Sequence, residues 1–177
     1  MKKVLFFATL LLCMGLTSCE KEDIGGTATE SMAGEWYVTV DAADANGNVV
    51  DGLEDPFGLG KIHVLTYNAS DNNPNVLIVD DLQNFWGFKA KTNCDQNTLT
   101  FSTSTSENNN LVAGNEDINV TITGGKIIKN GGVQNNGSKA DYIEFYVSFS
   151  DDPYPGAYGY ASYKVSGVRY SGLTEND

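Results

Sequence analysis

Residues 142–149 alternate apolar and polar side chains with a period of two. Positions 143, 145, 147 and 149 are all apolar, and Glu144 and Ser148 stand among the residues between them. Successive side chains of a β-strand point to opposite faces, whereas a helix repeats its apolar positions every three or four residues. The segment is therefore predicted to be a strand with one face in the core and the other in solvent.

Similar short runs fill the rest of the chain. They are separated by Gly, Asn, Asp and Pro, and no apolar stripe continues at helical spacing. The predicted strands cover residues 34–41, 61–68, 75–80, 85–92, 98–105, 117–129 with a Gly124-Gly125 break, 141–150 and 157–170. We therefore expect an all-β fold of eight antiparallel strands, arranged as a sandwich or as a closed up-and-down barrel, which has no exposed sheet edges.

The first residues have the features of an export signal. Two lysines precede an apolar run over residues 4–16, after which Leu-Thr-Ser leads directly into Cys19. This order predicts a lipoprotein signal peptide over residues 1–18, cleaved before Cys19, whose thiol then carries the lipid. A transmembrane anchor is the alternative, but the run of roughly 13 residues is shorter than the ~20 that a spanning helix needs.

Residues 19–32 are poor in bulky apolar groups and rich in Gly, Thr and charge, which predicts a lipidated flexible tether. Residues 33–177 then form one β-barrel domain. The acidic cluster Glu20, Glu22 and Asp23 resembles the tag that sends some lipoproteins of Bacteroidota to the outer leaflet, and an ordinary hydrophilic spacer is the alternative. The sequence thus predicts an outer-membrane lipoprotein. If the acidic cluster is an export tag, the protein is exposed at the cell surface.

Acidic side chains outnumber basic ones by 23 to 11, which gives a net charge of −12. Phosphate binding needs a basic face, so nucleic acid is excluded as a partner. Cys13 and Cys19 belong to the predicted signal and lipidation site, which leaves Cys94 without a disulfide partner in the domain. His63 is the single histidine, so the chain lacks the clusters that form zinc sites. We expect a monomer without a metal or cofactor.

Both ends of the domain resemble the lipocalins. Gly34-x-Trp36 matches their G-x-W signature, and Arg169 stands near the end of the last strand, where those proteins carry an arginine. The resemblance implies a barrel rather than a sandwich. It also implies that Gly34, Trp36 and Arg169 close one end, with the guanidinium lying across the indole in a cation–π contact.

Four further segments are similar to the lipocalin-like lipoproteins of Bacteroidota known as lipid-binding putative hydrolases. The segments are residues 63–68 (HVLTYN), 84–89 (NFWGFK), 123–128 (TGGKII) and 165–172 (VSGVRYSG). The similarity spans most of residues 34–172, and the closing Ser-Gly-x-Arg-x-x-Gly segment is its most specific part. It implies a lipocalin-like barrel with an apolar ligand. Together with the predicted lipid anchor, this predicts a binding protein of the cell envelope whose partner is a small apolar or amphipathic molecule.

Hydrolysis finds little support in the residues themselves. A serine hydrolase needs a nucleophile, a histidine base and an acid, but only His63 could be the base and no Gly-x-Ser-x-Gly elbow is present. The acidic pairs Asp80-Asp81 and Asp151-Asp152 could suggest a glycosidase, yet adjacent acids in a strand or turn point in different directions. No catalytic residue is predicted, and a weak hydrolase using His63 is kept only as an alternative.

Aromatic side chains are the best candidates for a binding site. Trp86 and Phe88 fall on one face of a predicted strand, and tyrosines crowd the segment before the last strand. Near an open mouth they would line an apolar pocket with a few polar contacts, and the alternative is that they fill the barrel. The candidate ligand-binding residues are Trp86, Phe88, His63, Tyr67, Phe145, Tyr158 and Tyr160. In a rival interpretation, a surface glycan-binding or assembly lipoprotein would use Trp86, Tyr154 and Tyr158 as an exposed stacking platform.

Overall fold

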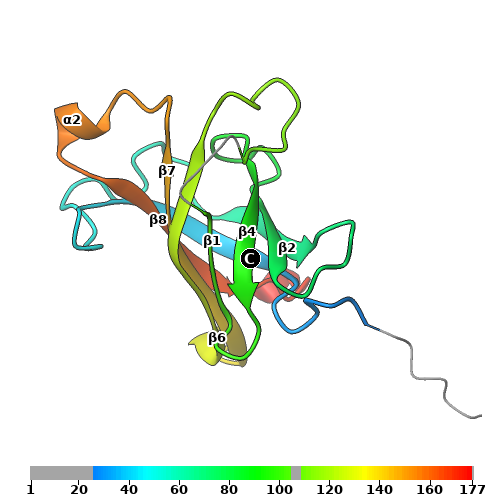
Figure 1. The fold of residues 1–177 in the computed structure, drawn as a ribbon. Coiled ribbons are helices and arrows are strands. Elements are labelled where there is room, and N and C mark those ends of the chain that lie inside the picture. The colour runs from blue at the N-terminus through cyan, green and yellow to red at the C-terminus, as the bar shows by residue number, and fades with distance from the viewer. Residues whose placement is uncertain (1–25, 105–108, 177) are drawn as a thin grey trace, which may run out of the picture.

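The computed structural model describes residues 26–104 and 109–176, so the predicted signal peptide and Cys19 lie outside the described residues. Eight antiparallel strands form one closed barrel, in which each strand pairs with the next and the last returns to the first (Figure 1). The strands are β1 (Gly34–Ala43), β2 (Ile62–Asn68), β3 (Val76–Asp80), β4 (Lys89–Asp95), β5 (Thr100–Ser102), β6 (Val120–Val133), β7 (Lys139–Phe149) and β8 (Ser162–Arg169). The expected eight-stranded barrel is confirmed.

The alternation of side chains determines which face of each strand lies inside. In β7, positions 143, 145, 147 and 149 are buried and the residues between them are half-buried. The first two strands follow the same rule, with Trp36, Val38 and Val40 buried in β1 and Ile62 and Val64 buried in β2. These inward side chains belong to one hydrophobic core. The barrel is thus packed with side chains over much of its length.

The β3–β4 connection differs from the expected strand over residues 85–92. The fully buried Asp81 carboxylate accepts backbone N–H groups of Gln83, Trp86, Gly87 and Phe88 at 2.8–2.9 Å, and that of Phe85 at 3.3 Å. Such side-chain bonds to the backbone compete with strand pairing. The prediction is therefore wrong for residues 85–88, which form a turn, and β4 begins only at Lys89.

Further segments differ in detail from the sequence expectation, and the strand expected over residues 98–105 is confined, within its described residues, to β5 (Thr100–Ser102). The break at Gly124-Gly125 is a bulge within the continuous strand β6, marked by a register shift between Thr123 and Lys126. The last strand begins at Ser162 rather than at residue 157, because the short helix α2 (Pro155–Tyr158) comes first. Gly159 ends that helix with a φ of 78°, a left-handed conformation that glycine adopts without strain.

The two ends of the barrel are different. β1 begins and β8 ends at one of them, so the N-terminal turn and the 3-10 helix η2 (Thr174–Asn176) lie there. Thr29 and Met32 are fully buried at this end, although both fall within the expected tether. The β1–β2, β3–β4, β5–β6 and β7–β8 connections lie at the opposite end, which we call the mouth. Figure 1 shows α2 far from the N-terminal segment.

The seam between β1 and β8 depends on a glycine. A Cβ at Gly167 would lie 2.1 Å from the carbonyl oxygen of Tyr37 and 2.6 Å from the Cα of Val38. Gly167→Ala is therefore expected to force the two strands apart and to lower the free energy of unfolding by about 1–3 kcal/mol. Gly156→Ala is the control, since a Cβ there would meet nothing within 4 Å. Urea unfolding that shows equal stability for both variants would contradict a tight seam.

Candidate functional site

Trp36 lies at the end of the barrel opposite the mouth and is fully buried. Its indole Nε1 donates a hydrogen bond to Oγ1 of Thr66 at 2.8 Å. The Thr66 hydroxyl in turn donates to the carbonyl oxygen of Met32 at 2.6 Å. The one polar atom of the tryptophan side chain is thereby satisfied inside the core, as burial of an indole requires.

Arg169 covers this tryptophan. The centre of its guanidinium lies 4.6 Å from the centroid of the Trp36 ring, and its Nη1 donates to the carbonyl oxygen of Ala33 at 2.9 Å. Its Nε lies 3.4 Å from Oδ2 of Asp141. A Cβ at Gly34 would come within 2.2 Å of Nη1, so only glycine leaves room for the guanidinium. The three residues of the expected barrel closure therefore lie together.

Aromatic side chains fill the barrel below the mouth. The ring of Trp86 stacks on that of Phe149, with centroids 4.7 Å apart and an interplanar angle of 2°. Phe85, Phe88 and Tyr163 also pack against Phe149, at centroid distances of 5.7, 5.5 and 6.3 Å. Because these rings occupy the space, a ligand that enters at the mouth meets a floor of aromatic side chains.

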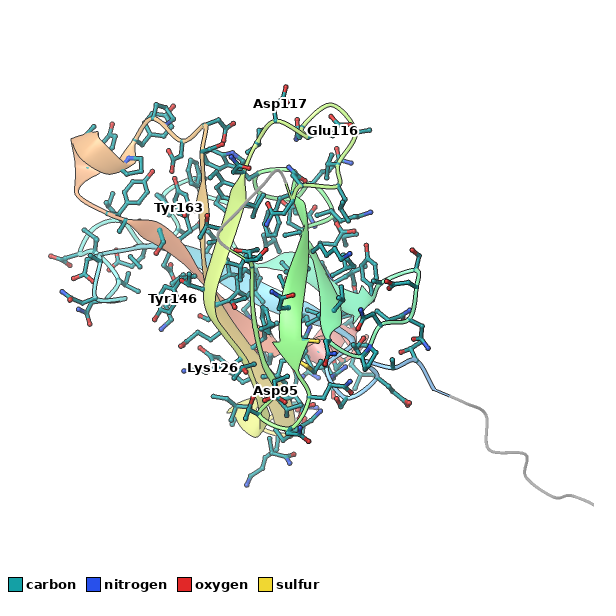
Figure 2. The ribbon with its side chains drawn as sticks, viewed as in Figure 1. Asp95, Glu116, Asp117, Lys126, Tyr146 and Tyr163 are labelled. Atoms are coloured by element: carbon teal, nitrogen blue, oxygen red, sulfur yellow. The ribbon has the colours of Figure 1, made fainter. Side chains whose placement is uncertain are left out.

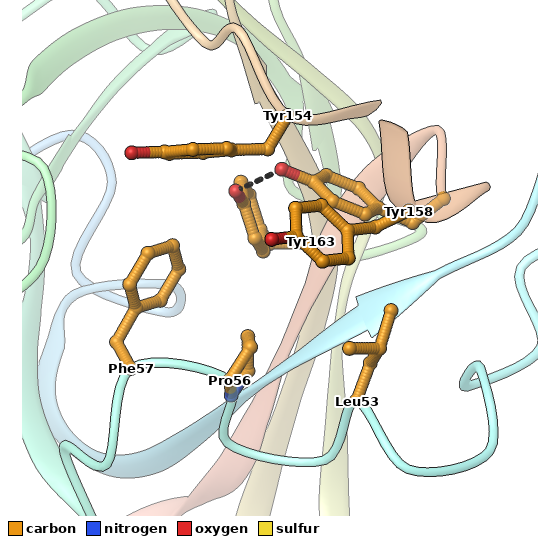
Figure 3. A pocket seen from close by; sticks show the side chains of 7 residues that line it. Leu53, Pro56, Phe57, Tyr154, Tyr158 and Tyr163 are labelled. Atoms are coloured by element: carbon orange, nitrogen blue, oxygen red, sulfur yellow. Dashed lines mark hydrogen bonds between the residues drawn. The ribbon is translucent and has the colours of Figure 1, made fainter. Parts of the chain in front are cut away.

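A pocket of about 340 Å³ opens above this floor, between the β1–β2 and β7–β8 connections. It is lined by Leu53, Pro56, Phe57, Tyr154, Tyr158, Tyr160 and Tyr163 (Figure 3). Figure 3 shows Leu53, Pro56 and Phe57 along one side and Tyr154 and Tyr158 on the other. The volume is within the range of small-molecule sites, and none of the lining residues carries a charge.

The β1–β2 side of the pocket is held by one carboxylate. Asp55, with a φ of 41°, accepts the backbone N–H groups of Leu59 at 2.7 Å and Gly60 at 2.8 Å. Its own N–H donates to Oδ1 of Asp41 on β1 at 3.0 Å. These bonds fix the turn that presents Pro56 and Phe57, and the Phe57 ring packs 5.6 Å from that of Tyr163.

The β7–β8 side of the pocket contains a network of hydroxyl groups. Tyr160 and Tyr163 each donate to Oδ2 of Asp152 at 2.8 Å, and the two phenolic oxygens also lie 2.5 Å apart. Burial raises the pKa of Tyr160 to about 12 and raises that of Tyr163 further. Both hydroxyls therefore stay protonated near neutral pH and act as hydrogen-bond donors, not as nucleophiles or bases.

The residues expected to bind ligand fall into three groups. Tyr158 and Tyr160 line the pocket, and Trp86 lies beside it, with its ring 6.0 Å from that of Phe57. Phe88 and Phe145 are buried in the core. His63 and Tyr67 point outward from β2, away from the barrel interior.

The outward pair has other partners. His63 Nδ1 lies 2.8 Å from Oε1 of Glu35, and its ring contacts that of Tyr170 with centroids 4.6 Å apart. The hydroxyl of Tyr67 donates to Asp80 at 2.8 Å, and burial together with this contact raises the pKa of Tyr67. Neither residue lines the mouth pocket, so the structure does not bring them together with the tyrosines there.

Sequence reasoning missed the β1–β2 side of the pocket, formed by Leu53, Pro56 and Phe57. These residues stand in a connection rich in Gly and Asp, where no alternation marks them. The available signal was a large aromatic residue within a polar loop, and in the structure Phe57 is 42% exposed. An aromatic ring in such a loop is a candidate for contact with a ligand.

The two acidic pairs do not form a glycosidase arrangement. Asp80 pairs with Lys89 at 3.1 Å and Asp81 holds the β3–β4 turn. Asp151 accepts the indole N–H of Trp86 at 3.0 Å, and Asp152 accepts the two phenols. Each carboxylate thus has its own structural partner. Within residues 26–104 and 109–176, no group of three or more His, Cys, Asp or Glu side chains could hold a metal ion.

The fold and this site define a class: a small, closed up-and-down β-barrel with a ligand-sized aromatic pocket at its mouth. The family described as lipid-binding putative hydrolase matches residues 21–174 of the sequence. The chain therefore belongs to that family, as its motifs predicted. No curated protein matches the chain.

Proposed function

We propose that this protein binds a small lipid-like molecule in the mouth pocket. The observation that carries the proposal is the pocket itself, whose lining is apolar and phenolic and whose volume is about 340 Å³. Membership of a lipid-binding family supports the same ligand class. Because Trp86, Phe88 and Phe149 fill the barrel below, the ligand lies at the mouth and not along the barrel axis.

The geometry of the mouth favours this function over the stacking of sugars on a flat aromatic platform. The exposed rings of Tyr154 and Tyr158 are inclined at 62° to each other, so they do not share a plane. Trp86 presents one of its faces to Phe149 and is only partly exposed. A concave site with few free polar groups suits an apolar chain better than a hydroxyl-rich sugar.

Ligand binding can be tested with monolaurin, a neutral molecule with a twelve-carbon chain, followed by the change in tryptophan emission of the full chain, which has Trp86 beside the pocket and Trp36 at the opposite end. We expect Phe57→Ser/Tyr158→Ser to weaken binding roughly 10- to 100-fold, because contact with two aromatic rings is lost. Stability should change little, since these side chains are 42% and 58% exposed. Ile128→Ser, at a site 42% exposed on β6, is the control. Unchanged affinity in the double variant would exclude the mouth pocket.

The proposal includes the cell envelope as the place of action. A monomer anchored to the outer membrane through acyl chains on Cys19 agrees with the basic, apolar and Leu-Thr-Ser-Cys order of the first residues. The described residues contain no helix long and apolar enough to cross a membrane. We expect Cys19→Ala to abolish incorporation of labelled fatty acid and to release the protein from washed membranes. Membrane recovery equal to wild type would contradict the anchor.

A further inference from the structure

Aromatic rings surround the mouth pocket on several sides. Tyr154, Tyr158, Tyr160, Tyr163 and Phe57 make up most of its lining. Figure 3 shows Tyr154 and Phe57 on opposite sides of the open space. The faces of aromatic rings carry a partial negative charge and attract cations within about 6 Å of the ring centre. Several rings around one small space are the arrangement that holds a quaternary ammonium group, which has no N–H to donate.

The charge around the mouth has the matching sign. Of the described residues in the four connections at this end, the acidic ones are Asp44, Asp51, Glu54, Asp55, Asp81, Glu116, Asp117, Asp151 and Asp152. Lys61 is the only basic one among them, and its Nζ lies 5.1 Å from the ring centroid of Tyr37, outside the pocket. Figure 2 shows Glu116 and Asp117 beyond the end of the barrel. The field at the mouth therefore favours cations.

The lysines on the strand ends nearest the mouth do not alter this balance. Lys89 pairs with Asp80 at 3.1 Å, and Lys164 pairs with Glu144 at 3.1 Å. Both belong to the barrel wall, and neither lines the pocket. The lining thus contains no cation that could pair with a negatively charged head group.

The hydrogen bonds inside the pocket lead to the same ligand class. The hydroxyls of Tyr160 and Tyr163 are already bonded to Asp152, whose Oδ1 also accepts the N–H of Tyr154 at 3.0 Å. These donors are therefore not free to bind a carboxylate or sulfate. A phenol that donates to a carboxylate becomes richer in electrons, which strengthens the attraction of its ring for a cation.

We propose that the mouth pocket selects amphiphiles with a quaternary-ammonium head group and disfavours anionic ones. This inference rests on the proposed function and specifies its ligand class. The ammonium group lies among the five aromatic rings of the pocket, with the Asp152 carboxylate behind Tyr160 and Tyr163. The acidic connections around the mouth raise the local concentration of such ligands.

Three probes with the same twelve-carbon chain test the inference: dodecyltrimethylammonium, monolaurin and dodecyl sulfate. Binding to the full chain is measured by calorimetry below each critical micelle concentration, at fixed ionic strength. We expect the cation to bind at least tenfold more tightly than monolaurin, and dodecyl sulfate to bind more weakly than either. Tetramethylammonium, which has no chain, should compete with the cationic probe.

Variants at Tyr154 distinguish the contribution of its ring to binding from that of its hydroxyl. The residue is 46% exposed, so these variants leave the core undisturbed. Tyr154→Leu should reduce the preference for cation over monolaurin by roughly 2- to 30-fold, whereas Tyr154→Phe should keep it. Equal binding of all three probes would overturn the inference and leave the proposed function standing. Binding of none would overturn both, as would a response to oligosaccharides alone.

Discussion

Trp36→Ala is expected to lower the free energy of unfolding by about 3–5 kcal/mol, as removal of a large buried aromatic side chain does. The change creates a cavity where the indole was fully buried, and it removes the hydrogen bond to the Thr66 hydroxyl and the ring beneath the Arg169 guanidinium. Equilibrium unfolding in urea measures the effect. With a loss of this size, much of the marginal stability of a domain would disappear.

Two comparison variants make this result specific. Arg169→Ala should cost less, on the order of 0.5–2 kcal/mol, because the cation–π contact is lost while the core stays filled. Trp86→Ala should likewise cost less than Trp36→Ala, since Trp86 is partly exposed at the mouth. A neutral Trp36→Ala variant would show that the closed end does not support the barrel.

Asp81→Ala is expected to have a comparable effect, on the order of 3–5 kcal/mol, through hydrogen bonding instead of packing. The buried carboxylate accepts N–H groups from the turn formed by residues 82–88, and each buried donor left without a partner costs roughly 1–3 kcal/mol. The same turn positions Trp86, so affinity for monolaurin should also fall. Unfolding and calorimetry together measure both effects.

Asp95→Ala is the matched control for Asp81. Its carboxylate accepts the backbone N–H of Asn97 at 2.9 Å, at the exposed end of β4. We expect a cost of about 1 kcal/mol or less there. Asp81→Asn should be intermediate, because it keeps the side-chain volume and replaces one acceptor oxygen with a donor. If Asp81→Ala and Asp95→Ala were equally mild, the turn would owe its shape to other contacts.

Alternation predicted the antiparallel strands because each strand has one face in the core, and the resemblance to lipocalins decided between a barrel and a sandwich. Alternation also predicts which side chains of β2 point into the barrel. Val64 and Thr66 point inward, so His63 and Tyr67 must point outward. The alternation of side chains along the strand therefore excludes both residues from a site inside the barrel. Their inclusion among the ligand-binding candidates did not take side-chain direction into account.

The mouth could not be predicted in the same way. The apolar residues 85–88 have the composition of a strand, and only the bonds made by Asp81 show that they form a turn. The pocket is assembled from two connections far apart in the sequence, at residues 53–57 and 154–163. No periodicity relates Phe57 to Tyr163, since their contact is set by the closure of the barrel.

The pairing of β1 with β8 also constrains how the chain folds. Trp36 and Arg169 are partners across this seam, so strands from opposite ends of the sequence must meet before the barrel closes. Until β8 arrives, one edge of β1 has no neighbour, and such an edge can pair with another chain. Contacts this distant in sequence slow folding. In the export that we propose for this chain, the N-terminus crosses first and that edge stays open until β8 has followed, so a chaperone that shields open strands would act during this interval.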